Sequence, residues 1–173
     1  SVLKGSELPE GHPDRKFKGR SVYQGNQAKD EYGLQAIFED LCSSPAAMEA
    51  GRVLHAYGLA AGNDTQIADA VKAFVQTTLK RKAETWVRLP KERQPKSWAN
   101  MRDPVVPLRL ALCGHPDSGG WWEKHLEEHL FTTGWKPVPE WRSTYYNESL
   151  KCLLAVYVDD FKVSGPKENL SRA

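Results

Sequence analysis

The chain has few of the features that mark secreted, membrane-spanning or repetitive proteins. Its three cysteines, Cys42, Cys113 and Cys152, are odd in number and widely spaced, and none belongs to a C-x-x-C pair. A disulfide framework is therefore not expected, and reduced thiols fit an intracellular protein. No apolar run approaches the roughly 20 residues that a membrane-spanning helix needs, and no signal-peptide pattern opens the sequence. We therefore expect a soluble, intracellular protein without a membrane partner.

Strong net charge is also absent, and +2 is too small to indicate nucleic-acid binding by itself. Basic residues do gather locally, in two groups: Arg15, Lys16, Lys18 and Arg20, and then Lys80, Arg81, Lys82, Arg88, Lys91, Arg93 and Lys96. Such groups can neutralise phosphates. For the second group, an ordinary solvated face is an equally good interpretation.

At 173 residues, with 40% apolar and 27% charged residues, the chain is long enough for one domain with a real core. The glycines and prolines of residues 1–14 predict an irregular leader. We expect the domain itself to span residues 15–173. Strands are predicted by short apolar or β-branched runs at residues 15–24, 65–70, 86–89, 105–112, 145–146 and 150–158. Residues 90–105, with Pro90, Pro95 and Pro104, are expected to be loop.

Two segments have helical periodicity. The first is opened by Ser44, has Pro45 at its first position and is closed by Gly62. The second has Ser118 as its predicted N-cap, and Trp122, Leu126 and Leu130 recur along one face. Helices packed on one side of a mostly antiparallel sheet give an α+β fold.

The most informative motif is Tyr157-Val158-Asp159-Asp160, which stands between the apolar run Leu153–Val156 and the β-rich run Phe161–Ser164. Two adjacent acids between two strand-like runs predict the tip of a hairpin. An ordinary Asp-Asp turn is one interpretation. A second is a divalent-cation site, because hard carboxylate oxygens select Mg²⁺, whose other positions are filled by water and substrate phosphates.

Two earlier segments favour the metal interpretation. Asp69 follows a short apolar approach ninety residues before Asp159, in the pattern D-x-x-x-A-F that ends at Phe74. Between them, Ala111-Leu112-Cys113-Gly114 leads into the helix that begins near Ser118 and continues Trp121-Trp122-Glu123-Lys124. With Y-V-D-D, this order resembles the palm of reverse transcriptases, most closely those of copia-type LTR retrotransposons. Lys18-Gly19-Arg20-Ser21-Val22 is similar to the family's K-x-R-L-V fingers segment, so the resemblance runs from about Arg15 to Gly165.

The resemblance implies an RNA-directed DNA polymerase with a fingers and palm fold that uses two Mg²⁺ or Mn²⁺ ions. Asp69 and Asp159 would bridge the ions, with Asp160 as an auxiliary carboxylate and the Ala70 carbonyl as a backbone ligand. We then expect the Asp69 and Asp159 carboxylates to lie on the order of 4 to 7 Å apart. The substrate-binding residues would be Lys18 and Arg20 at the triphosphate, Phe74 beneath the sugar, Gly114 at the nascent base pair and Tyr157 at the primer terminus.

The implied partners are an RNA or DNA template with its primer, deoxynucleoside triphosphates, and the integrase and RNase H domains of the same polyprotein. Because the chain ends soon after the hairpin, without thumb or RNase H region, we expect a polyprotein fragment or a degenerate remnant. Its location would be cytoplasmic, in a virus-like particle, or nuclear. One departure from the family pattern is Asp117, which replaces the usual glutamine after Gly114.

Other functions remain open on the sequence. A non-catalytic nucleic-acid-binding remnant would keep the basic segments without synthesis. His125-Leu126-Glu127-Glu128-His129 satisfies H-x-x-E-H, the pattern of inverted zinc metallopeptidases. A solvent-facing helix surface explains the same residues, and a third zinc ligand would have to be Glu140, Glu148 or Glu168. Cys113 and His115 could supply half of a structural zinc site. A core residue is the other interpretation of Phe74.

Overall fold

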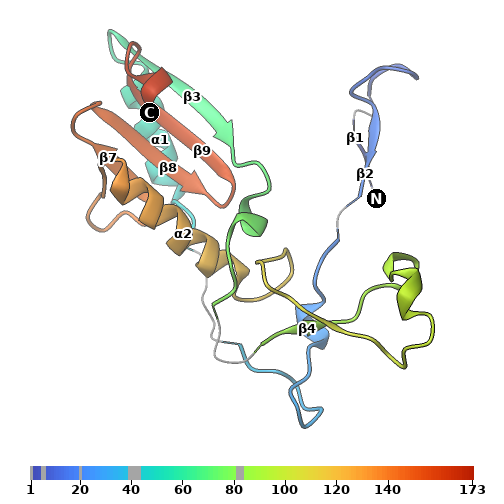
Figure 1. Cartoon of the computed structure of the whole chain (residues 1–173). Helices are drawn as coiled ribbons and strands as arrows, with labels where there is room; N and C mark the ends of the chain where they lie inside the picture. The colour runs from blue at the N-terminus through green and yellow to red at the C-terminus, as the bar shows by residue number, and fades with distance from the viewer. Residues whose placement is uncertain (1, 5–6, 20, 39–43, 81–83) are drawn as a thin grey trace.

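The computed structural model describes residues 2–4, 7–19, 21–38, 44–80 and 84–173 (Figure 1). Two α-helices, α1 (Met48–Gly58) and α2 (Ser118–Thr132), accompany one five-stranded sheet within these residues. The sheet consists of β3 (Asn63–Asp69), β6 (Trp135–Pro137), β7 (Thr144–Asn147), β8 (Cys152–Tyr157) and β9 (Asp160–Pro166). All its pairings are antiparallel. The predicted α+β class with an antiparallel sheet is therefore confirmed.

The strand order is β3-β9-β8-β7-β6, so the earliest strand of the sheet lies beside the latest one. β3 pairs with β9 along its whole length, from Asn63 opposite Pro166 to Asp69 opposite Asp160. β8 and β9 form the hairpin expected from the sequence, with Tyr157 opposite Asp160. This register brings the end of β3 to the tip of the β8–β9 hairpin.

The two helices cover opposite faces of the sheet, and the expectation that both pack on one face is wrong. Cys152, Leu154 and Val156 of β8 join a buried cluster with Trp122, Leu126 and Leu130 of α2. Ala155, the residue between, instead packs with Ala50 and Leu54 of α1, with Leu153 at the edge of this second cluster. The cause is the composition of β8, which is apolar without alternation and therefore needs cover on both faces. In Figure 1, α1 is seen behind the strands.

Outside this sheet the chain forms two short antiparallel pairs, β1 (Val2–Lys4) with β2 (Lys16–Lys18) and β4 (Trp86–Val87) with β5 (Val106–Pro107). Both stand apart from the large sheet in Figure 1. The remaining elements are short 3₁₀ helices: η1 (Gly25–Gln27), η2 (Ala73–Gln76), η3 (Lys91–Arg93), η4 (Lys96–Trp98) and η5 (Leu170–Arg172). Near β4, the buried ring of His115 contacts the rings of Tyr23 and Phe38.

Several predicted strands are shorter in the structure. Of the strand predicted over residues 15–24, only β2 is present, and of that over 86–89, only β4. The strand predicted over 105–112 is reduced to β5 and an isolated bridge from Leu110 to Thr78. Prolines explain part of this, because Pro90 and Pro107 have no N–H to donate to a continuing ladder. The irregular leader expected over residues 1–14 does not hold for Val2–Lys4, which pairs with β2.

The serines expected to cap the helices have other partners. Ser118 is the first residue of α2, after Asp117, and its hydroxyl donates to the Leu112 carbonyl oxygen at 2.8 Å. The Ser44 amide donates to a Glu123 carboxylate oxygen of α2 at 3.0 Å, and α1 begins only at Met48. The stripe of Trp122, Leu126 and Leu130 is buried as predicted. Neither serine therefore caps a helix, and both helices begin without a side-chain cap hydrogen bond.

No helix of the described residues is long and apolar enough to cross a membrane. The two cysteines within these residues, exposed Cys113 and buried Cys152, are both free thiols, while Cys42 lies outside the described ranges. Burial raises the pKa of the Cys152 thiol.

The packing of α1 can be tested with adjacent positions of the helix. Leu54 is 0% exposed against the sheet, whereas Val53 is 44% exposed. We expect Leu54→Ala to lower the free energy of unfolding by about 3 kcal/mol, from lost burial and the cavity left behind. Val53→Ala should change it by about 0.5 kcal/mol or less. Urea unfolding measures both, and equal small effects would contradict the placement of α1.

Candidate metal centre

Three acidic side chains converge where β3 ends and the β8–β9 hairpin turns. One carboxylate oxygen from each of Asp69, Asp159 and Asp160 lies within 4.8 Å of the other two. Asp69 is the last residue of β3, directly opposite Asp160 at the start of β9, and Asp159 is in the turn between β8 and β9. The expected convergence of Asp69 with the Y-V-D-D hairpin, on the order of 4 to 7 Å, is confirmed.

The turn that carries Asp159 has two residues, Val158 and Asp159, between the paired Tyr157 and Asp160. Val158 has φ of 59°, a conformation that is rare for a β-branched side chain and that glycine usually supplies in hairpins. Two hydrogen bonds hold the turn from outside. The Ala70 amide donates to the Asp159 carbonyl oxygen at 2.7 Å, and the Trp122 indole N–H donates to the Val158 carbonyl oxygen at 2.7 Å.

No basic side chain of the described residues balances the charge of this cluster through an ion pair. All three acids are exposed, and within the described ranges no Lys, Arg or His forms an ion pair with any of them. Carboxylates this close repel one another, and a divalent cation between them would remove that repulsion. An all-oxygen donor set suits Mg²⁺ or Mn²⁺. The residues present therefore fit a hard divalent cation.

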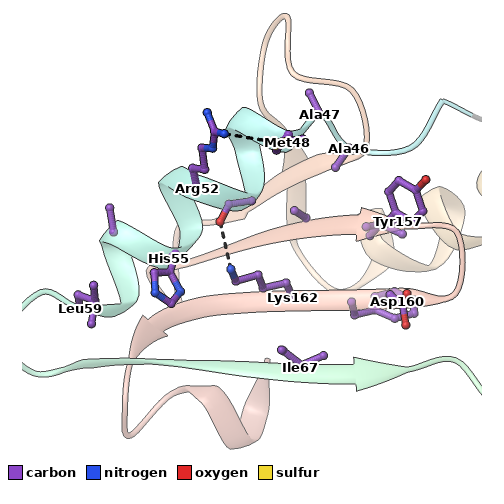
Figure 2. A pocket seen from close by; sticks show the side chains of 15 residues that line it. Ala46, Ala47, Met48, Arg52, His55, Leu59, Ile67, Tyr157, Asp160 and Lys162 are labelled. Atoms are coloured by element: carbon purple, nitrogen blue, oxygen red, sulfur yellow. Dashed lines mark hydrogen bonds between the residues drawn. The ribbon is translucent and has the colours of Figure 1, made fainter.

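A groove of about 770 Å³ begins beside the acids and runs between α1 and the sheet (Figure 2). Tyr157, 60% exposed, and Asp160 lie at one end of it, and Leu59 and His55 lie toward the other. Lys162 crosses the groove and donates from its ammonium to the Gly51 carbonyl oxygen of α1 at 3.1 Å. The groove is thus mainly apolar, with cations of α1 and β9 along it and the acids at one end.

The other predicted substrate residues are placed less favourably. Arg20 lies outside the described residues, and Lys18 ends β2, in the hairpin that stands apart from the sheet in Figure 1. Phe74, in η2, is half-buried and packs against the core cluster of α2, which favours the core interpretation. Of the predicted site residues, the structure groups Asp69, Asp159 and Asp160, with Ala70 and Tyr157 beside them.

Gly114 has a structural reason to be glycine. Its φ is 90°, and a Cβ atom there would stand 2.1 Å from the Tyr23 carbonyl oxygen. The Tyr23 amide also donates to the Cys113 carbonyl oxygen at 2.8 Å, so the two segments run in close contact. Close approach of the nascent base pair to Gly114 stays a prediction. Asp117, which replaces the family's glutamine, is fully buried, so its carboxylate does not face solvent.

The H-x-x-E-H residues do not gather a zinc site. His125, Glu128 and His129 are exposed on α2, and the acid cluster is the only metal-compatible group of three found within the described residues. Glu127 instead accepts a hydrogen bond from the Tyr145 hydroxyl at 3.0 Å. Burial, followed by the nearby Glu127 charge, raises the pKa of Tyr145. Cys113 is exposed while His115 is buried, which gives no support to a zinc site there.

Sequence reasoning missed the contact of Trp122 with the hairpin. The periodicity of α2 assigned Trp122 to the core, and the structure confirms its burial at 5% exposure. Nothing in that periodicity shows that the indole N–H bonds a turn 36 residues later in the chain. The one signal in the sequence was a tryptophan at a core position. A buried tryptophan usually donates its indole N–H to a hydrogen-bond acceptor.

The contact between Gly114 and Tyr23 gives a stability prediction. Gly114→Ala should lower the free energy of unfolding by about 2 kcal/mol or more, because the new methyl group meets backbone and the positive φ is strained. Gly51→Ala in α1, where a Cβ atom meets nothing within 4 Å, should raise it by up to about 1 kcal/mol. Urea unfolding compares the two, and a neutral Gly114→Ala would show that this contact is absent in solution.

Comparisons of the chain with protein-family models, curated proteins and solved structures found no match. The features that bear on function are the acid cluster, its setting in the sheet and the motifs that resemble reverse transcriptases.

Proposed function

We propose that this chain is the fingers and palm segment of a copia-type RNA-directed DNA polymerase, which joins deoxynucleotides to a primer 3′-hydroxyl. The observation that carries the proposal is the convergence of Asp69 with Asp159 and Asp160, within 4.8 Å, from segments ninety residues apart in the chain. The order of the motifs and the position of Asp69 on the strand next to the Y-V-D-D hairpin support it. If Asp159 and Asp160 only formed a turn, Asp69 would not need to lie beside them.

The three carboxylates would hold Mg²⁺ or Mn²⁺, as two ions, with the Ala70 carbonyl as a backbone ligand. Ions bound there would lower the pKa of the primer hydroxyl and stabilise the charge of the leaving pyrophosphate. The new bond joins the primer 3′-oxygen to the α-phosphorus of the nucleotide, and the bond to pyrophosphate breaks. Asp69 and Asp160 lie on adjacent paired strands, so the backbone ladder fixes their separation before any substrate binds.

Primer, template and nucleotide would meet beside this cluster. Tyr157 is exposed near Asp160 and lines the groove beside α1. This position would allow its side chain to contact the primer terminus. Lys162 and Arg52 along the groove could neutralise primer phosphates. In this proposal Lys18 and Arg20 bind the triphosphate, Phe74 selects the sugar and Gly114 faces the nascent pair. The partners are a primed RNA or DNA template and the integrase and RNase H domains of the polyprotein.

A non-catalytic nucleic-acid-binding remnant is the alternative that experiment must separate. The described residues of the second basic group, including Arg88, Lys91, Arg93 and Lys96, are exposed and suit either function. The metallopeptidase has less support, because no third ligand joins His125 and His129 among the described residues.

The test of the proposed function is the substitution Asp159→Asn, which removes one carboxylate oxygen donor without changing the size of the side chain. Extension of a primed template by the purified chain in Mn²⁺ should fall on the order of 100-fold or more. Asp64→Asn, at the far end of β3 and away from the cluster, should leave extension unchanged. Binding of the primer-template should be retained in both variants.

The other outcomes discriminate between the functions. Primer-template binding without Mn²⁺-dependent extension by the unmodified chain would favour the non-catalytic remnant. A His125→Ala, His129→Ala double variant should extend primers normally. Zinc-dependent peptide cleavage by the unmodified chain that disappears in this double variant would favour the metallopeptidase and contradict the proposal.

A further inference from the structure

The tip of the β8–β9 hairpin is tied to the core by one tryptophan side chain. Trp122 projects from the second turn of α2 and is 5% exposed in the cluster beneath the sheet. Its indole N–H reaches the Val158 carbonyl oxygen at 2.7 Å. Phenylalanine would also fill an apolar site, but tryptophan adds an N–H donor to the buried ring. The ring therefore connects the packed core with the turn that carries Asp159.

That connection acts on a strained part of the backbone. Val158 has φ of 59°, and a β-branched residue is disfavoured in this conformation. Without an outside partner the peptide unit after Val158 could rotate to relieve the strain, and Asp159 would move with it. The Ala70 amide holds the next carbonyl, that of Asp159, from the side of β3. The two donors, one from α2 and one from the residue after β3, fix successive peptide groups of a two-residue turn.

We propose that Trp122 is a positioning residue of the acid cluster: its N–H holds the Val158 peptide so that Asp159 and Asp160 stay close to Asp69. It touches neither the acids nor any substrate, so it acts through the turn. The consequence for nucleotide transfer rests on the proposed function, whereas the consequence for metal affinity and for hairpin order does not. Outer partners of this kind commonly change metal affinity by about 10- to 100-fold.

The decisive variant is Trp122→Phe, which keeps an aromatic ring in the core and removes the N–H. The probe is Mn²⁺ alone, followed by electron paramagnetic resonance of the purified chain. We expect the dissociation constant for Mn²⁺ to rise about 10-fold. The matched control is Tyr145→Phe, which removes the hydroxyl that donates to Glu127 within the same core cluster, away from the acids. Its Mn²⁺ affinity should equal that of the unmodified chain.

A second readout does not depend on metal. Amide hydrogen exchange, followed by mass spectrometry, should be faster over residues 157–161 in Trp122→Phe and unchanged there in Tyr145→Phe. A rescue variant adds Val158→Asn to Trp122→Phe, because asparagine tolerates positive φ better than valine. The double variant should recover Mn²⁺ affinity to within about 3-fold of the unmodified chain and slow the exchange again.

The outcomes separate this proposal from the proposed function. Unchanged exchange over 157–161 in Trp122→Phe, or an equal change in Tyr145→Phe, would overturn the positioning role and leave Trp122 as a core residue. If the unmodified chain binds no Mn²⁺, the metal centre of the proposed function fails, and the exchange comparison still decides whether Trp122 orders the turn. Failure of Val158→Asn to rescue would contradict the role of backbone strain.

Discussion

The pairing of β3 with β9 is the constraint on which the candidate site depends. These strands are separated in the sequence by α2 and by β6, β7 and β8, yet their register sets Asp69 opposite Asp160 at the end of the ladder. Because side chains alternate along a strand, a slip of one residue would turn Asp69 to the other face of the sheet. The hydrophobic cores fix the hairpin to which β3 pairs, because β8 is covered from both sides and β9 packs on the α2 side. The acid cluster is therefore a product of the whole sheet.

The two helices have different relations to that cluster. α2 packs on one face, fills the main core and reaches the hairpin tip through Trp122. α1 covers the other face only in part and leaves the groove where Tyr157 and Asp160 are exposed. One helix thus provides rigidity beneath the turn, while the other borders an accessible surface beside the acids.

Sequence patterns predicted the parts of this arrangement that are encoded locally. The Y-V-D-D turn, the stripe of α2 and the strand that ends at Asp69 were all found, because each depends on neighbouring residues. The faces covered by the helices were predicted wrongly, although the unbroken apolar run of β8 already indicated cover on both faces. The contacts of Trp122 with Val158 and of Gly114 with Tyr23 join distant segments, and no periodicity encodes such partners. Pro90 and Pro107 explain part of the shortening of the strands outside the sheet.

The central claim is that Asp69, Asp159 and Asp160 together form a divalent-metal centre. The most direct measurement is a crystal structure of the chain grown with Mn²⁺, with the metal located by its anomalous scattering. We predict a Mn²⁺ peak at a coordination distance of about 2 Å from oxygens of all three acids, on the face of the sheet that α1 covers. Acids that stand apart in the crystal, or Mn²⁺ bound elsewhere while the cluster attracts none, would contradict the claim.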